Sequence, residues 1–303
     1  MKTRGRVSGV EFDAHGNLWV IHRTDPPILE FDPAGNFVKS IGTGMFVQAH
    51  SLHFDRNGNL WATDGQARDG KGNQVFKFGP DGKVLLTLGK AGVAGDGPDV
   101  FNGVCDIVSA PNGEVFVADG HTNARVLKFS KDGKFIAAWG NKGIGPGEFN
   151  VPHAIAMDSA GRVFVGDRAN NRIQIFDQNG NYITEWKQFG RPTGLYISKD
   201  DTLYVADDES NPTRNPGFTP GVHVGNAKNG SIIAFIPTGN TEPRRGRCER
   251  QYLHGGPRRQ DCPKIRKVEN PRYLFLPRWK TIPADARSPS CRVPKRLVRK
   301  YSA

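Results

Sequence analysis

The first 240 residues of this chain contain little cysteine and no long hydrophobic run. Of the 4 cysteines in the 303-residue sequence, only Cys105 lies in this region, which excludes a disulfide within it. No stretch has the apolar length that a membrane-spanning helix needs. The start, MKTRGRVSGV, has basic residues but no apolar run, which excludes a signal peptide in the chain as written.

The sequence instead repeats one phrase five times. Each copy has an alternating apolar segment, a Gly/Asn/Asp turn and a second apolar segment with an aromatic residue, which is typical of a β-hairpin. A further strand pair follows each hairpin, as in ILEFDPAGNFVKSIG. Four short strands per unit indicate a β-propeller blade. The five copies read GVEFDAHGNLWV, SLHFDRNGNLWA, DIVSAPNGEVFV, AIAMDSAGRVFV and GLYISKDDTLYV.

The spacing of the copies favours a propeller over a sandwich or a solenoid. The second-strand aromatics recur with a period of roughly 40 to 55 residues, within the range of propeller families. We therefore predict an all-β, six-bladed propeller with five intact blades in residues 1–240. The aromatics are Trp19, Trp61, Phe116, Phe164 and Tyr204, and the predicted blades span residues 7–42, 49–89, 104–140, 152–187 and 192–237.

Residues 241–303 differ abruptly in composition from the rest of the chain. They hold 18 of the 42 Lys and Arg residues but only 5 of the 30 Asp and Glu residues, a net charge of +13, whereas residues 1–240 have a net charge of −1 and the whole chain +12. No strand alternation is visible there. The ordinary interpretation is a disordered basic tail that binds nucleic acid.

We favour a second interpretation, in which residues 241–303 are the frameshifted product of a sixth blade. With chosen codons read one base later, residues 243–248 give PAEGVA, residues 250–255 give ANIYTA and residues 260–268 permit RTVRKFVK. These strings have the order and type of the missing strands. On this hypothesis no nucleic-acid partner is expected. An open ring also predicts poor stability, because two apolar blade faces would meet water.

Two histidines occupy the same position in different blades. His50 in QAHSLHFD and His153 in VPHAIAMD both stand just before the innermost strand. Residues at equivalent rim positions of a propeller point to a common axis, and two imidazoles there suit a divalent metal. The metal and the structural interpretation carry about equal weight. His53 and His223 lack this register and are interpreted as ordinary surface or loop histidines.

Three further residues stand near the predicted channel mouth. Arg23 and Arg168 place guanidinium groups where other blades have small or acidic residues, which suits a carboxylate-bearing ligand through bidentate pairing. Solvated surface arginines are nearly as good an interpretation. His121 follows the second strand of blade three and could be an acid/base group or a third metal ligand.

Four aspartates recur at the end of the second strand of their blades. A carboxylate at such a turn accepts backbone N–H groups or pairs with the arginine that follows. Because the position repeats in nearly every blade, we expect an architectural role rather than a catalytic one for Asp64, Asp119, Asp167 and Asp207.

Several phrases resemble the NHL-repeat six-bladed propellers and, within them, the peptidyl-α-hydroxyglycine α-amidating lyase family. They include FDPAGNFVKSIG, DGHTNAR, GIGPGEFNVPH and VPHAIAMDSAGRVFVGDRANNRIQIFD, and the resemblance covers residues 7–237. It implies a zinc ion held by three rim histidines, surrounded by two arginines and a tyrosine, and a structural calcium ion in the channel. That family cleaves the C–N bond of a peptidyl hydroxyglycine, giving a peptide amide and glyoxylate.

Carried over by position, the resemblance makes His50 and His153 zinc ligands and Arg23 and Arg168 substrate-contacting residues. His121 stands where the catalytic tyrosine is expected, and the third histidine is absent, with the Glu of PAEGVA near its place. We therefore expect a metal-dependent, lyase-like propeller with a small-molecule or peptide ligand in its central channel. The alternative is a non-catalytic binding scaffold. An upstream start would supply a closing strand and an export signal, so localisation stays open.

Overall fold

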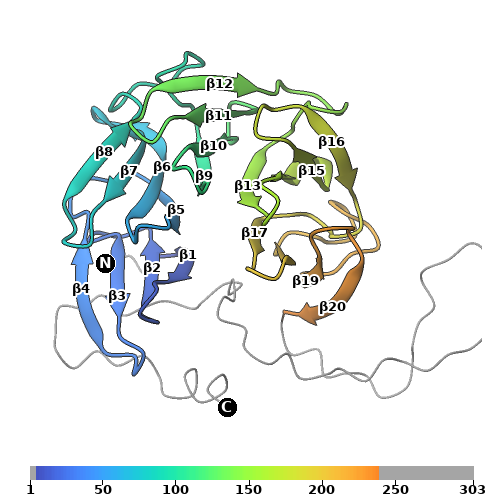
Figure 1. Cartoon of the computed structure of the whole chain (residues 1–303), viewed down its shortest axis with the longest axis horizontal. Coiled ribbons are helices and arrows are strands. Elements are labelled where there is room, and N and C mark those ends of the chain that lie inside the picture. Colours follow the sequence, from blue (N-terminus) through green and yellow to red (C-terminus); the bar gives the residue numbers. More distant parts are fainter. Residues whose placement is uncertain (1–4, 239–303) are drawn as a thin grey trace, which may run out of the picture.

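The computed structural model describes residues 5–238, which form five four-stranded antiparallel sheets. Each sheet pairs its strands in chain order, and the sheets follow one another around a common axis (Figure 1). The predicted all-β propeller with five intact blades is confirmed. The interpretation of residues 241–303 concerns a segment that lies outside the described residues.

Each blade holds four strands in chain order. Blade 1 contains β1 (Val7–Phe12), β2 (Leu18–His22), β3 (Ile28–Phe31) and β4 (Phe37–Ile41). Blade 2 contains β5 (Ala49–Phe54), β6 (Leu60–Arg68), β7 (Lys71–Phe78) and β8 (Val84–Leu88). Blade 3 contains β9 (Val104–Ser109), β10 (Val115–Asp119), β11 (Arg125–Phe129) and β12 (Phe135–Trp139). Blade 4 contains β13 (Pro152–Met157), β14 (Val163–Asp167), the 3₁₀ turn η1 (Arg168–Asn170), β15 (Arg172–Phe176) and β16 (Tyr182–Trp186). Blade 5 contains β17 (Gly194–Ile197), β18 (Thr202–Asp207), β19 (Gly221–Asn226) and β20 (Ile232–Pro237).

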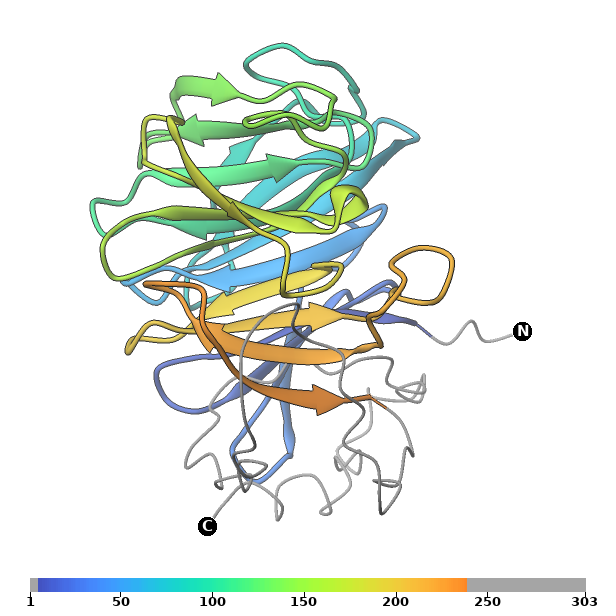
Figure 2. The same ribbon diagram turned by 90° about the vertical axis from the view of Figure 1, so that its right-hand side faces the viewer.

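The innermost strands β1, β5, β9, β13 and β17 line the axis (Figure 1). Seen from the side, the strands run across the molecule, so their ends gather at two rims (Figure 2). The loops that follow the second strand of each blade therefore meet at one rim. Among residues 5–238, no helix is long and apolar enough to cross a membrane.

A recurring Asp-x-x-Gly-Asn turn closes the hairpins. The backbone N–H of Asn17 donates to Asp13 Oδ1 at 2.9 Å, and that of Asn36 donates to Asp32 Oδ1 at 2.8 Å. The glycine of the first turn, Gly16, has a φ of 83°, a conformation that L side chains avoid. The turn chemistry in the sequence thus sets the strand boundaries.

The aspartates at the second-strand ends are architectural, as predicted. Asp64 Oδ2 accepts the backbone N–H of Val47 at 2.8 Å, and Asp167 Oδ1 accepts that of Asn150 at 2.6 Å. Each carboxylate thus holds the loop that leads into its own blade. Asp167 also pairs with Arg172, whose Nε lies 2.7 Å from Asp167 Oδ2.

Large apolar clusters fill the spaces between neighbouring blades. Trp61 of blade 2 packs with Ile107 and Leu127 of blade 3, and Phe116 of blade 3 packs with Val165 and Phe176 of blade 4. Similar clusters join blades 4 and 5 and blades 1 and 2. Among the described residues, the other face of blade 1 carries only a small cluster, built around Val20, Leu29 and Phe31.

Candidate metal centre

Three histidines from three successive blades converge near the axis. His50 lies on β5, His153 lies on β13, and His121 lies on the loop that follows β10. Their ring centroids form a nearly equilateral triangle with sides of 4.9, 5.0 and 5.1 Å. The structure thus brings together both predicted metal ligands and His121.

Backbone carbonyls orient two of these rings. His50 Nδ1 donates to the carbonyl oxygen of Cys105 at 2.8 Å, and His153 Nδ1 donates to that of Thr193 at 2.8 Å. A neutral imidazole that donates through Nδ1 has its lone pair on Nε2. The Nε2 atoms of His50 and His121 are only 3.0 Å apart. This arrangement is the one in which histidines are held for a metal ion.

The surroundings keep the imidazoles neutral. Burial, reinforced by the neighbouring His121 imidazole and Arg23 guanidinium, lowers the pKa of His50 to about 3. Burial and the guanidinium of Arg168 lower the pKa of His121 to about 4, and burial lowers the pKa of His153 well below its ordinary value. Near neutral pH, each ring is therefore neutral and offers one lone pair, while its other nitrogen keeps the proton.

Two glycines let the His121 loop approach the other histidines. Gly103 has a φ of 94°, and a Cβ atom there would lie 2.6 Å from His121 Cβ. A Cβ atom at Gly120 would lie 1.8 Å from the carbonyl oxygen of Pro152 on β13. Only glycine permits contacts this close, so the local sequence NGVCD and DGHTN is what places His121 in the cluster.

The two predicted arginines flank the triangle. Arg23 follows β2 and lines a cavity of about 410 Å³, here called the upper cavity. His121, Gln48 and Asn102 also line it. Arg168 begins η1, and its positive charge lowers the pKa of each of the three histidines. The cluster therefore lies in a positive field that would attract an anionic ligand.

A carboxylate that the sequence analysis missed organises this rim. Glu209 follows β18, and its Oε2 accepts from Arg191 Nε at 2.8 Å and lies 3.9 Å from Arg168 Nε. Arg191 in turn donates to the backbone oxygen of Arg168 at 3.0 Å. No repeat position singles out Glu209 or Arg191, because their contacts join separate blades.

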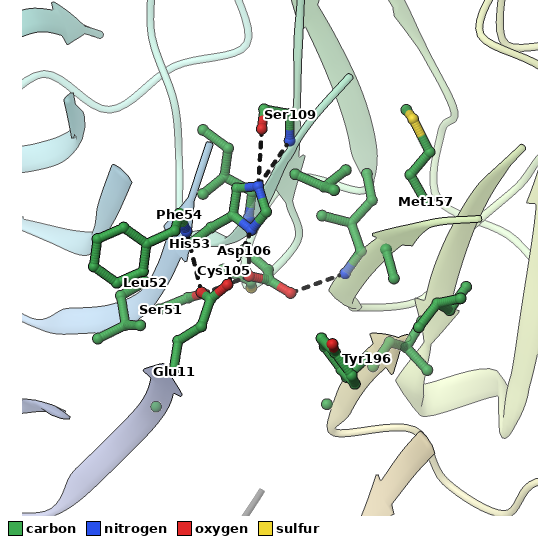
Figure 3. A pocket seen from close by; sticks show the side chains of 18 of the residues that line it. Glu11, Ser51, Leu52, His53, Phe54, Cys105, Asp106, Ser109, Met157 and Tyr196 are labelled. Carbon is green, nitrogen blue, oxygen red and sulfur yellow. Dashed lines mark hydrogen bonds and ion pairs between the residues drawn. The ribbon is translucent and has the colours of Figure 1, made fainter. Parts of the chain in front are cut away.

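A second cavity of about 370 Å³, here called the lower cavity, extends along the channel between the innermost strands (Figure 3). It contains Glu11 and Asp106, which the sequence analysis missed. Burial raises the pKa of Glu11 to about 8 and that of Asp106 to about 6. Asp106 accepts the hydroxyl of Ser51 and the backbone N–H of Ile155, the latter at 2.9 Å.

The interpretation of His53 and His223 as surface or loop histidines is wrong. His53 lies on β5 and faces the lower channel, where its Nε2 is 2.9 Å from Ser109 Oγ and its Nδ1 is 3.7 Å from Glu11 Oε1 (Figure 3). His223 is buried on β19 between the rings of Phe218 and Phe235. Strand periodicity turns both side chains inward, although neither shares the register of His50.

The histidine triangle fits zinc. Four-coordinate zinc with Zn–N bonds of about 2.0–2.1 Å separates its nitrogen ligands by about 3.3 Å, close to the 3.0 Å between His50 and His121. Together with Cys105, the histidines are the one group of three or more His, Cys, Asp or Glu residues within residues 5–238 whose ligand atoms could hold a metal ion. Glu11 and Asp106 do not extend to such a group, so calcium in the channel stays a prediction.

Two segments of the chain match models of known protein families. Residues 149–176 match the model of the NHL repeat, and residues 101–162 match that of a six-bladed β-propeller. The chain is a β-propeller with an NHL repeat in its fourth blade, as the sequence resemblance predicted.

Its relatives are named as amidating enzymes and NHL proteins. Peptidyl-glycine alpha-amidating monooxygenase B of Xenopus laevis is 33% identical, over 77% of this chain and 30% of that protein. Peptidyl-alpha-hydroxyglycine alpha-amidating lyase 1 of Drosophila melanogaster is 32% identical, over 60% of this chain and 40% of that protein. The chain thus spans only 21–30% of the length of the first relatives. A solved streptogramin B lyase, with a TM-score of 0.57 and 17% identity over 77% of this chain and 70% of that one, shares the fold.

Proposed function

We propose that this protein is a metal-dependent, lyase-like propeller that cleaves a C–N bond in a small or peptide ligand bearing a carboxylate. The observation that carries the proposal is the convergence of three neutral imidazoles, with the Nε2 atoms of His50 and His121 3.0 Å apart. Lone pairs that close repel one another unless a proton or a cation lies between them. Zinc is the ion that three histidines and one open position most often hold.

The names of the relatives supply the reaction class. Cleavage of a peptidyl α-hydroxyglycine breaks the bond between the amide nitrogen and the hydroxyl-bearing carbon, and it moves the hydroxyl proton to that nitrogen. Bound zinc would supply Lewis-acid polarisation of a ligand oxygen. Arg23 and Arg168 would bind the carboxylate as bidentate donors. Glu209 would hold Arg168 at the rim through the contact of 3.9 Å.

His121 acts as the third ligand in this proposal rather than as an acid/base group. Although His121 lines the cavity that Arg23 also lines, its Nε2 lies 3.0 Å from His50 Nε2, within the histidine triangle. The loop position expected to carry a tyrosine therefore supplies an imidazole to the metal. That exchange is the specific reason to retain the alternative of a non-catalytic scaffold that binds a ligand at the metal.

One experiment separates these two functions. The full chain would be purified with zinc, assayed for metal by plasma mass spectrometry, and incubated with a peptidyl α-hydroxyglycine while glyoxylate is measured. We expect about one zinc ion per chain, and glyoxylate formation that His50→Ala abolishes. Stoichiometric zinc without glyoxylate would favour the scaffold. A chain without stoichiometric metal would contradict the proposed centre.

A further inference from the structure

Cys105 completes the cluster on its lower side. The cysteine lies on β9 and is fully buried, and its Sγ atom and one ring nitrogen from each of the three histidines all lie within 4.8 Å of one another. Figure 3 shows it beside Asp106 and Ser51 in the lower channel. The same residue holds the ring of His50 through its carbonyl oxygen. The backbone carbonyl of Cys105 therefore orients one histidine, and its sulfur lies beside all three.

Little holds the sulfur away from a metal. In the described part of the chain, the thiol lies 3.4 Å from the carbonyl oxygen of Gly103, and the backbone N–H of Gly120 reaches the sulfur. Sulfur is a weak hydrogen-bonding group in both roles. The carbonyl of Cys105, by contrast, is held by two donors, His50 Nδ1 and Thr63 Oγ1, at 2.8 and 3.0 Å. The backbone of Cys105 is thus anchored beside the histidines, and its sulfur lies within 4.8 Å of their ring nitrogens.

The charges at the site call for an anionic ligand. Imidazole is an uncharged ligand, so three histidines would leave a divalent ion with both of its charges. Arg23 follows β2 and Arg168 follows β14, at the same rim. No carboxylate belongs to the cluster within residues 5–238. A buried cation is costly without a compensating charge, and a thiolate is an anion that zinc binds well.

We propose, on the basis of the metal centre proposed above, that the Cys105 thiolate is its fourth ligand. The thiol loses its proton to solvent as the sulfur–metal bond forms, and no oxidation takes place. Three nitrogens and one sulfur favour zinc or cobalt over magnesium, calcium or manganese. Cys105 lines the lower cavity, whereas His121 and Arg23 line the upper cavity. A ligand that enters through the upper cavity would therefore add a fifth donor to the three nitrogens and the sulfur.

The test requires a chain in which Cys105 is the sole thiol, because Cys248, Cys262 and Cys291 could also bind metal. The full chain with these three cysteines changed to serine would be loaded with zinc and examined by X-ray absorption. It would also be loaded with cobalt(II) and examined by ultraviolet absorption. The matched control adds Cys105→Ser, which keeps the size and removes the soft donor.

We expect one sulfur neighbour at about 2.3 Å and three nitrogens at about 2.0–2.1 Å from zinc, and an intense thiolate-to-cobalt charge-transfer band. In the Cys105→Ser control, the sulfur neighbour and the band disappear, the nitrogens remain, and zinc affinity falls by more than the roughly 10–100-fold typical of outer-shell changes. Metal bound through nitrogen and oxygen alone in the Cys105 chain would overturn the assignment but leave the proposed centre standing. A chain that binds no metal would overturn both.

Discussion

The three middle blades and the two outer blades play different parts in this molecule. Blades 2, 3 and 4 are each packed on both faces by large apolar clusters, and they supply His50, Cys105, His121 and His153. Among the described residues, blades 1 and 5 have a large cluster on one face only, and they supply Arg23 and Glu209. The metal ligands thus come from the best-packed part of the fold, while the groups that would hold a ligand come partly from its edges.

The largest expected effect is on metal content and would separate the two regions. His153→Ala, in blade 4, should sharply reduce bound zinc from about one ion per chain, because it removes one of the proposed metal ligands. Arg23→Ala, in blade 1, should leave zinc in place and weaken binding of a carboxylate ligand. Metal analysis and ligand titration of both variants measure this. Loss of zinc from Arg23→Ala would break the distinction.

The next effect is on stability. Phe116 is fully buried between blades 3 and 4, whereas Phe31 belongs to the small cluster on the outer face of blade 1. Phe116→Ala should cost about 3–5 kcal/mol of unfolding free energy, and Phe31→Ala should cost less, because fewer neighbours lose contacts. Denaturant unfolding compares them. Equal losses would show that the edge of blade 1 is as well packed as the middle.

The third effect is a dependence of folding stability on pH, which arises from Glu11 in blade 1. The folded state holds the Glu11 proton up to about pH 8, while the unfolded chain releases it near the ordinary pKa of 4.5. Between these values the folded state binds more protons, so Glu11 makes stability fall as pH rises, by at most about 1.4 kcal/mol per pH unit.

Glu11→Gln removes this dependence, so its advantage over the parent should grow from pH 5 to pH 8. Thermal unfolding across that range gives the comparison. A constant difference between the two proteins would contradict the raised pKa.

The smallest effect concerns solubility. β20 at the edge of blade 5 exposes Ile232, Ile233, Phe235 and Ile236, whereas β16 in blade 4 exposes Ile183 and Tyr182. Changing Ile233 and Ile236 to lysine should raise solubility with less than about 0.5 kcal/mol change in stability. Ile183→Lys is the control and should help less. Light scattering on heating measures the aggregation of each variant. An equal gain in solubility from the two changes would contradict the expected difference between the edges.

The fold was readable from the sequence because its determinants are local. Turns such as that of Asp13 and Gly16 close each hairpin through contacts four residues apart, and the repeat extends the argument from one blade to five. His50 and His153 were readable for the same reason, since they share a register in two copies.

The rest of the site depends on contacts between blades. The carbonyl of Cys105 accepts from His50, 55 residues away, and Glu209 of blade 5 lies 3.9 Å from Arg168 of blade 4. No repeat position encodes these pairs. The choice between acid/base group and metal ligand for His121 also needed the distance between two ring nitrogens. Local pattern predicts which strands form, but not which side chains meet on the axis.

The most direct test of the metal centre is the zinc content and affinity of His121→Gln, measured against the parent chain by competition with a chelator. If His121 is the third ligand, affinity should fall by at least about 100-fold, beyond the effect of outer-shell changes, and zinc should be lost on dialysis. Retention of zinc with parental affinity would contradict the three-histidine centre.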